Sequence, residues 1–359
     1  MNQEFSTMQR QSGVFKKFCR RAKNQCGVRL LLLFVFFALY SCSKHKPPGV
    51  YLYQLSEGGY SPTANALLLV LHADYGERLR GVLLATYDID KSELKRLLTS
   101  ITPNPFDFAW SPTKDLFVTT HGPRMSLFRK DESPDGYTGT PIRCPLSFLY
   151  TFCAWDTRGE WLAVTCTNMR ESGPHRLRLG LYNLATEEFV VSKIPITQSA
   201  PIWKDDTTLY VPNVDSILEV TIDAGAPKIV RSIPIEKGFL RAHGVFGGKV
   251  LISTNDKVKL GDRILVESDQ TAETKVLTTQ ELIFILEYPG SLVAFDHQGN
   301  EVGKTTPGRE IRFFSVGEVP SVLYGIAGSV LLRIHVKDGE IYIRELSDLA
   351  NFENRCQNK

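Results

Sequence analysis

One phrase recurs along this chain, and it constrains the fold more than any other feature. The phrase is an aromatic residue, then a polar turn, then a β-rich run. Three copies read AWSPTKDLFVTT, AWDTRGEWLAVTC and PIWKDDTTLYVPN, and they carry Trp110, Trp155 and Trp203, which lie 45 and 48 residues apart. A repeat of this length indicates an array of similar units, such as a propeller or a solenoid.

Weaker copies extend the repeat in both directions. YSPTANALLLVL starts at Tyr60, fifty residues before Trp110, and has Tyr in place of Trp. Later copies start at Val245 (VFGGKVLIST), Thr278 (TTQELIFILEY) and Val316 (VGEVPSVLYGI). Several copies are followed by a second β-rich run that ends in Asp or Asn, residues that suit tight reversals of the chain. The period therefore contains several short strands separated by turns.

Short strands and turns within a fixed period are the signature of propeller blades. A four-stranded blade cannot bury both of its faces alone, whereas a closed ring of blades buries them all. The 318 residues from Cys42 to Lys359 fill seven blades of about 45 residues, and six blades is the alternative because the later copies are closer together. We therefore predict an all-β fold, one β-propeller of seven four-stranded blades. Only residues 92–98 and 346–351 fit short helices, and the former fits an outer strand better.

The repeat resembles two propeller families. AWSPTKDLFVTT resembles the repeat of TolB-like propellers, an aromatic residue followed by Ser-Pro-Asp-Gly and a strand. Residues 110–112 match it, while Thr113 and Lys114 replace Asp-Gly. LYVPNVDSILEVTID at 209–223 resembles the YVTN-type repeat, with Pro212 in place of Thr. The resemblance implies a propeller fold, but propellers serve binding, scaffolding and several kinds of catalysis, so it implies little about function.

The N-terminus has the features of an export signal. Residues 1–29 carry seven basic residues and one acid, and the apolar run LLLLFVFFALY follows at 30–40. A membrane-spanning helix needs about 20 apolar residues, whereas eleven fit the core of a signal peptide. Leu39-Tyr40-Ser41-Cys42 resembles the lipobox of bacterial lipoprotein precursors, with a larger residue than usual at Tyr40. The resemblance implies cleavage before Cys42 and lipidation of Cys42.

These features predict three segments: a signal peptide at 1–41, a lipidated cysteine with a short tether at 42–49, and the propeller at 50–359. The expected location is the bacterial cell envelope, as a periplasm-facing or outer-membrane lipoprotein. The alternative is an inner-membrane protein held by an uncleaved signal anchor. Without the leader the chain has 42 − 7 = 35 basic and 39 − 1 = 38 acidic residues, a net charge of −3. Nucleic acid is therefore not an expected partner.

Cysteine usage is compatible with export. Beyond Cys42 the chain has Cys144, Cys153, Cys166 and Cys356. An oxidising compartment favours one disulfide among the first three, with the pairing left open. The alternative is that these residues are small buried thiols.

Known catalytic and cofactor motifs are absent from the sequence. It contains no Gly-x-Ser-x-Gly, no P-loop, no His-Glu-x-x-His and no zinc-spaced Cys/His cluster. We predict no catalytic residue, no cofactor and no metal site. The leading interpretation is a non-catalytic propeller that binds an envelope protein or a small anionic ligand. The alternative is a lactonase- or lyase-type propeller enzyme, in which acids or histidines from different blades converge on the central channel.

Blade topology sorts polar residues onto two edges. With strands A to D running outward, the A–B and C–D turns share one edge (the turn edge), and the B–C and D–A loops share the other (the loop edge). The turn edge collects acids, which are common turn residues. The loop edge collects basic residues, among them His72, Arg78, Arg170, His175 and Arg176. Six loop-edge residues are the candidate binding residues: His121, Arg124, Arg241, His243, Arg309 and Arg312.

Arginine offers paired donors to carboxylates and phosphates, and histidine changes charge near neutral pH. The loop edge is therefore predicted to bind an acidic partner or a small anion. The alternative is that it is an ordinary solvated loop surface.

Overall fold

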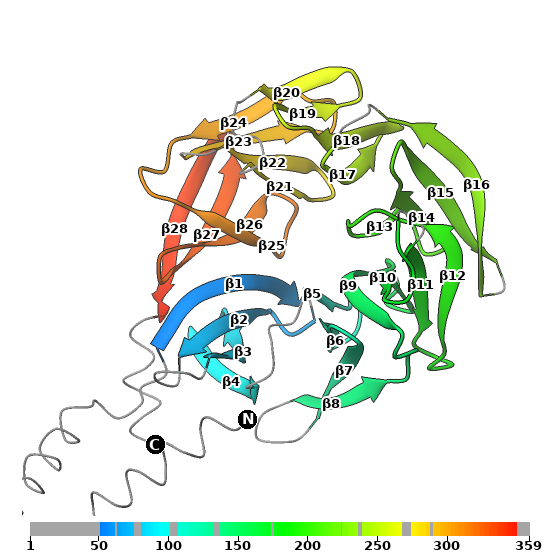
Figure 1. Ribbon diagram of the computed structural model, residues 1–359. Helices are drawn as coiled ribbons and strands as arrows, with labels where there is room; N and C mark the ends of the chain where they lie inside the picture. The colour runs from blue at the N-terminus through cyan, green and yellow to red at the C-terminus, as the bar shows by residue number, and fades with distance from the viewer. Residues whose placement is uncertain are drawn as a thin grey trace, which may run out of the picture. The chain divides into compact units, whose positions relative to one another are not determined.

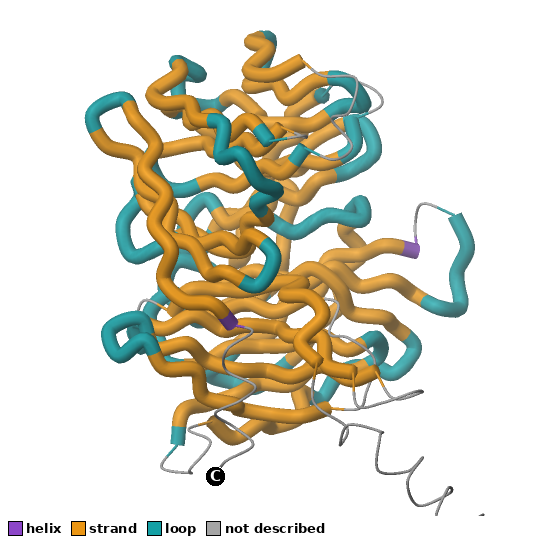
Figure 2. The backbone as a smooth tube through the Cα atoms, turned by 90° about the vertical axis from the view of Figure 1, so that its left-hand side faces the viewer, coloured by secondary structure: helices purple, strands orange, loops and turns teal. Residues whose placement is uncertain are grey.

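The structure is a computed structural model. It describes residues 51–61, 63–74, 80–100, 107–131, 137–173, 176–223, 225–235, 239–267, 274–287 and 290–349. The expected signal peptide, Cys42, the tether and Cys356 lie outside the described residues. Within the described part, the regular secondary structure is almost entirely strand, joined by loops and turns (Figure 2), and there is no helix long and apolar enough to cross a membrane.

The described strands form seven antiparallel sheets, each made of four strands that are consecutive in the sequence. Blade 1 contains β1 (Tyr51–Ser61), β2 (Ala66–Asp74), β3 (Arg80–Asp88) and β4 (Glu93–Ser100). Blade 2 contains β5 (Asp107–Trp110), β6 (Leu116–His121), β7 (Arg124–Lys130) and β8 (Tyr137–Ile142). Blade 3 contains β9 (Phe148–Trp155), β10 (Trp161–Asn168), β11 (Leu177–Asn183) and β12 (Phe189–Pro195).

The second half of the chain repeats this plan. Blade 4 contains β13 (Ile202–Trp203), β14 (Thr208–Pro212), β15 (Ser216–Asp223) and β16 (Ala226–Pro234). Blade 5 contains β17 (Arg241–Phe246), β18 (Lys249–Ser253), β19 (Lys257–Leu260) and β20 (Arg263–Glu267). Blade 6 contains β21 (Lys275–Thr278), β22 (Leu282–Glu287), β23 (Ser291–Asp296) and β24 (Glu301–Thr305). Blade 7 contains β25 (Arg312–Val316), β26 (Val322–Ala327), β27 (Val330–Lys337) and β28 (Glu340–Asp348).

The blades stand in a ring (Figure 1), so the propeller with seven four-stranded blades is confirmed and the six-blade alternative is wrong. The first strand of each blade is the innermost one. Strand β1 contacts both β5 and β25, which joins the first blade to the second and to the last. Each sheet is built from one continuous stretch of chain, so the ring closes by packing of blade 1 on blade 7.

A hydrophobic cluster fills each of the seven gaps between adjacent blades. Strand β22 shows how one strand serves two gaps. Ile283 and Ile285 pack toward blade 5, while Phe284 and Leu286 pack toward blade 7, because side chains alternate between the two faces of a strand. A blade buried on both faces needs continuous apolar runs, and this explains sequences such as LIFIL.

The three repeat tryptophans occupy equivalent places in consecutive blades, as the repeat predicts. Each lies at the end of an innermost strand and donates its indole N–H to a main-chain carbonyl of the preceding blade. The residue accepting the bond always precedes that blade's own aromatic residue. The bonds run from Trp110 to Gly59 at 2.9 Å, from Trp155 to Ala109 at 3.0 Å and from Trp203 to Ala154 at 2.9 Å.

The residue after the aromatic holds the tight A–B turn. The hydroxyl of Ser61 accepts a hydrogen bond from the main-chain N–H of Ala64 at 3.2 Å. Ser111 accepts one from the N–H of Lys114 at 3.2 Å. In blade 3 the same place is taken by Asp156, whose carboxylate accepts bonds from two turn N–H groups. The repeat therefore contains the pairs Tyr-Ser, Trp-Ser and Trp-Asp because an aromatic residue is followed each time by the residue that caps the turn.

Blade 1 closes the ring through Tyr60, the aromatic residue of its repeat. The main-chain N–H of Tyr60 donates to the hydroxyl of Ser315 in blade 7 at 2.7 Å. The ring of Tyr60 stacks on Tyr324, with centroids 6.0 Å apart, and Tyr324 donates its hydroxyl to Glu318 at 2.8 Å. Closure therefore combines apolar packing with specific polar contacts.

Two local predictions are settled by the strands. Residues 93–98 belong to the outer strand β4, as favoured, whereas the helix considered for 346–351 is wrong because Leu346 to Asp348 complete β28. The expected disulfide is also wrong for the described cysteines, since Cys144, Cys153 and Cys166 are present as thiols. Cys153 and Cys166 are buried. Burial raises the pKa of the Cys166 thiol, which keeps it protonated and unreactive.

Candidate functional site

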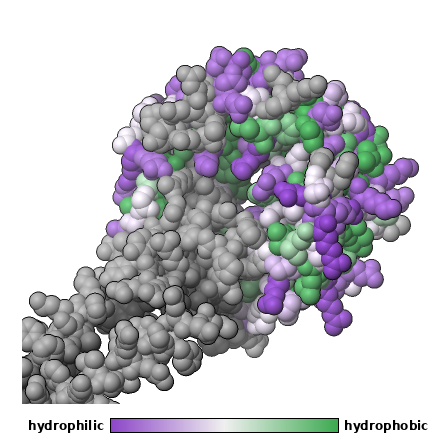
Figure 3. Space-filling model, viewed as in Figure 1, coloured by the Kyte–Doolittle hydropathy of each residue, from purple (hydrophilic) through white to green (hydrophobic). Residues whose placement is uncertain are grey.

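The strand order places the beginnings of all seven innermost strands on the loop edge. Alternation of the antiparallel strands puts the ends of the second strands and the starts of the third on the same edge. In the space-filling view a gap is visible near the centre of the ring, and hydrophilic side chains lie along part of its described border (Figure 3). Residues near the start of an innermost strand are therefore the best placed to meet a ligand at this opening.

Strand β17 places two of the candidate residues there. Arg241 is its first residue and is exposed, and His243 follows two positions later and is half-buried. The Nε2 atom of His243 lies 2.7 Å from the hydroxyl of Ser253 on β18. Burial, reinforced by the charge of Arg241, lowers the pKa of His243 to about 3. His243 is therefore neutral at physiological pH, and the cation at this position is Arg241 alone.

A third residue, Asp107, is the first residue of β5 and is not among the predicted binding residues. Its carboxylate accepts hydrogen bonds from the main-chain N–H of Cys153 at 2.7 Å and of Phe108 at 2.9 Å. Burial raises the pKa of Asp107 to about 6, while those two hydrogen bonds and the charge of Arg241 oppose the rise. Blade 3 thus holds the Asp107 carboxylate in place, and the charge of Arg241 in blade 5 lowers its pKa.

Asp107 and Arg241 each begin an innermost strand, and the charge of Arg241 is one of the influences that lower the pKa of Asp107. Blades 2 and 5 are not neighbours in the ring, so an electrostatic interaction between β5 and β17 runs across its centre. Arg241 forms no ion pair with any acid among the described residues. The candidate site is therefore the loop-edge start of β5 and β17, which carries one guanidinium without an ion-pair partner among the described residues, one neutral imidazole and one anchored carboxylate.

A signal for Asp107 was present in the repeat. Three residues before its Trp, blade 2 has Asp107, whereas blade 3 has Phe152 and blade 4 has Ala200. Blade 1 also has an acid there, Glu57, so the position is acidic in two repeats and apolar in two. An acid at a position that is apolar in other repeats departs from their packing pattern, and such departures mark candidate functional sites.

The other four candidate residues lie on the same edge, and Arg312 also begins an innermost strand. Arg124 is exposed at the start of β7, the third strand of blade 2. Arg309 lies in the link before β25 and forms an ion pair with Glu345 on the outermost strand of blade 7, at 2.9 Å. For His121, at the end of β6, and Arg312, at the start of β25, the structure describes the main chain only. The six residues share an edge, and whether they bind one ligand stays a prediction.

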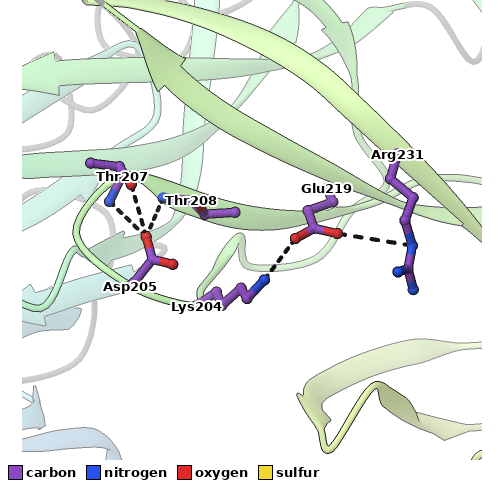
Figure 4. A network of polar contacts seen from close by, with 6 residues as sticks. All are labelled: Lys204, Asp205, Thr207, Thr208, Glu219 and Arg231. Carbon is purple, nitrogen blue, oxygen red and sulfur yellow. Dashed lines mark hydrogen bonds and ion pairs between the residues drawn. The ribbon is translucent and has the colours of Figure 1, made fainter.

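The expected separation of charge between the two edges is weaker than predicted. On the turn edge Asp115 is paired with Lys130 at 2.8 Å, and Glu187 with Arg129 at 2.9 Å. Figure 4 shows a further pair in blade 4, where Lys204 of the A–B turn donates to Glu219, in the middle of β15, at 2.8 Å. Acids of the turn edge are thus balanced by nearby bases, and the long-range field is correspondingly small.

The residues of Figure 4 also show that turn-edge acids have structural roles. Asp205 accepts hydrogen bonds from the main-chain N–H groups of Thr207 and Thr208 at 2.9 and 2.7 Å, and so caps the turn after β13. Glu219 lies between Lys204 and Arg231, whose Nε is 3.9 Å away. These groups satisfy one another, which leaves the loop edge as the better candidate for a ligand.

A metal site in the channel would need several ligating side chains close together. In the described parts of the chain, no three His, Cys, Asp or Glu side chains come close enough to hold a metal ion. The lactonase- or lyase-type alternative therefore finds no support in the structure.

Comparisons with known proteins give information on the fold alone. No family model and no curated protein matches this chain. The fold is similar to the C-terminal WD40 domain of Sif2, with a TM-score of 0.53 and 12% identity over 82% of this chain and 86% of that one. Hsv2 of Kluyveromyces lactis has a TM-score of 0.51 and 7% identity over 82% and 99%. A functionally unknown protein from Desulfotomaculum acetoxidans has a TM-score of 0.52 and 12% identity over 75% and 93%. At identities this low, the structural similarity shows only a shared seven-bladed, WD40-like propeller fold.

Proposed function

We propose that this chain is a non-catalytic binding protein whose loop edge receives an acidic protein segment or a small anion at the central opening. Arg241 is the main anion-binding group, and Arg124 and Arg309 extend the basic surface outward. The sequence patterns add that the protein is exported and held in the bacterial envelope by a lipid on Cys42. A relationship to TolB-like or YVTN-type propellers belongs to this proposal and rests on the repeats alone.

The single observation that carries the proposal is the exposed guanidinium of Arg241, which begins the innermost strand β17 and forms no ion pair with any acid among the described residues. An exposed arginine without an ion-pair partner retains its paired N–H donors for a carboxylate or phosphate. Asp107 begins strand β5 in blade 2, which is not a neighbour of blade 5, and its carboxylate is fixed by two main-chain N–H groups. It gives the site a polarity, so that a ligand with both an anionic and a donor group would have one preferred orientation.

Neutral His243 contributes a hydrogen bond rather than charge. Because its Nε2 atom pairs with Ser253, the ring is held in one orientation beside Arg241. A propeller supports this role because its rigid ring presents a broad face, and binding energy is then not spent on ordering loops.

A capture experiment tests the proposal. Full-length protein would be isolated from detergent-solubilised envelopes, and the proteins bound to it would be identified by mass spectrometry. Replacing Arg124, Arg241 and Arg309 together by Glu should remove the captured partner while leaving the thermal unfolding temperature close to that of the wild type. An unchanged set of captured proteins from the folded variant would show that the loop edge is not the binding face.

Lipidation has its own test. Labelled palmitate should enter the wild-type protein, and Cys42→Ala should abolish the label. A wild-type chain that takes up no label, or that persists as an uncleaved precursor, would contradict the lipid anchor without affecting the proposal for Arg241.

A further inference from the structure

We propose that the loop edge of blades 2 and 3 docks on an anionic lipid surface. The first observation is where the fold leaves large apolar side chains exposed. Leu146 is 73% exposed, Val214 63%, Met169 52% and Leu240 51%, and all four lie in B–C or D–A loops. Elsewhere among the described residues only Val230, at 52% on the outer strand β16, is as exposed. Exposed apolar groups at one edge mark an interaction surface.

Two of these side chains lie on loops that are physically joined. The hairpin between β6 and β7 contacts the start of β9 through the N–H of Tyr150, which donates to the carbonyl of Gly122 at 2.7 Å. The link before β9 contacts the loop after β10 through the N–H of Met169, which donates to the carbonyl of Ser147 at 2.9 Å. Leu146 and Met169 are therefore neighbours at the tip of one rigid group of loops.

Arginines surround this pair. The described residues of the three loops, at 121–124, 142–147 and 168–178, include five arginines and one acid, Glu171. Glu171 is paired with Arg178, with its carboxylate oxygens 2.5 and 2.6 Å from the guanidinium. The other four arginines are exposed and form no ion pair with a described residue. We call these four and the apolar pair the docking sector: Arg124, Arg143, Leu146, Met169, Arg170 and Arg176.

The pattern fits a lipid surface better than a protein. Protein interfaces bury about 800 Å² per partner around a contiguous apolar centre, whereas the exposed apolar side chains here stand on separate loops of blades 2–3 and 4–5. A bilayer interface accepts single apolar side chains from several loops at once. It also lets arginines bury their aliphatic stems while their charges meet anionic headgroups.

The path of the chain favours the same orientation. Strand β1 begins at Tyr51 on the loop edge, nine residues after Cys42 (51 − 42 = 9). If Cys42 carries lipid, as proposed above, the chain enters the propeller on the edge that holds the docking sector. A single acyl chain gives only weak membrane binding, and a basic patch supplies the second signal that stable attachment needs.

Photo-crosslinking of the full-length chain tests this inference. Benzoylphenylalanine would replace Leu146, and the protein would be reconstituted in vesicles of phosphatidylcholine mixed with phosphatidylglycerol. Irradiation should give lipid adducts at this position and few at Val190, an outer-strand residue that is 48% exposed. The variants labelled at positions 146 and 190 carry the same N-terminal anchor. The difference in their lipid adducts therefore reports docking of this edge rather than attachment of the chain.

Charge reversal provides the second arm. Arg143→Glu with Arg170→Glu should lower the lipid adducts at position 146 by about ten-fold. The same charge change at Arg129 and Arg158, on the turn edge, should leave them unchanged. Vesicles of phosphatidylcholine alone should behave like the Arg143/Arg170 variant with the anionic mixture.

Three results would overturn the inference: equal lipid adducts at positions 146 and 190, adducts that ignore vesicle charge, or adducts to protein instead of lipid. The last would identify the sector as a protein-docking surface. The variant that tests partner binding shares only Arg124 with the docking sector, so reversing Arg241 and Arg309 alone in that test lets the two proposals fail separately. Cys42→Ala should preserve the difference between positions 146 and 190 in the molecules that still bind.

Discussion

The indole N–H of Trp155 donates a hydrogen bond to the main-chain carbonyl of Ala109, 3.0 Å away in the preceding blade. Ala109 immediately precedes Trp110, which makes the same bond one blade further back, to Gly59. The contact ties the end of one innermost strand to the end of the next. The repeat in the sequence is therefore a repeat of contacts between blades.

Trp155 is buried at 8% exposure, and Trp155→Ala should lower the free energy of unfolding by about 3–5 kcal/mol through lost burial and a cavity. Trp155→Phe keeps most of the apolar contact but leaves the Ala109 carbonyl without its donor, and should lower it by about 1–2 kcal/mol. Denaturant unfolding of the two variants measures both effects. Equal losses in the two variants would show that the hydrogen bond contributes nothing.

Gly59 should tolerate no side chain. A Cβ there would lie 2.6 Å from Cε2 of Phe108 and 2.8 Å from Cδ1 of Trp110. Gly59→Ala should therefore lower the free energy of unfolding by about 1–3 kcal/mol through overpacking. Combining it with Phe108→Leu should recover part of the loss, as a double-mutant cycle would show. Strict additivity of the two substitutions would contradict a clash between blades 1 and 2.

Ser315 tests the closure of the ring. Ser315→Ala removes the acceptor of the Tyr60 N–H, 2.7 Å away, and leaves that donor without its partner. The thermal unfolding temperature should fall by an amount that corresponds to about 1–3 kcal/mol. Ser329→Ala is the matched control, because its hydroxyl bonds Asp348 at an exposed position and its loss should have little effect. Comparable losses in both variants would contradict a special role for the junction of blades 1 and 7.

The channel residues should give opposing pH effects. Asp107 has its pKa raised from 3.8 to about 6, so between these values the native state holds a proton that the unfolded state has lost. Asp107 therefore lowers the free energy of unfolding as pH rises through this window. His243 has its pKa lowered from 6.5 to about 3, so below pH 6.5 only the unfolded state gains the proton. His243 lowers the free energy of unfolding as pH falls.

Single substitutions separate the two groups. Between about pH 4 and 6, Asp107→Asn should lose more stability on acidification than the wild type, and His243→Gln should lose less. On acidification, the loss in free energy of unfolding should differ between each variant and the wild type by about 1–2 kcal/mol. Partial exposure of Asp107 and His243 keeps this difference below the full size of their pKa shifts. Denaturant unfolding at several pH values measures it. Parallel pH profiles for the wild type and both variants would contradict the burial of these groups at the channel.

The sequence predicted the blades because each carries the same aromatic residue and turn cap, a pattern that packing between neighbours imposes locally. It predicted the edge on which Arg241 lies for the same reason, since strand order alone decides it. The coupling of Arg241 to Asp107 could not be predicted, because it depends on which blades face each other across the closed ring. The pairing of turn-edge acids was also missed, because partners such as Arg129 and Glu187 come from different blades.

The central claim is that ligand binding occurs on the loop edge, through Arg241 and its neighbours. The most direct test is the equilibrium affinity of the captured partner for two charge-reversed variants at several salt concentrations. Reversal of Arg124, Arg241 and Arg309 should weaken binding by ten-fold or more and flatten its salt dependence, while reversal of Arg129, Arg158 and Lys204 on the turn edge should change neither. Equal affinity for the wild type and the loop-edge variant, or a loss confined to the turn-edge variant, would contradict the account.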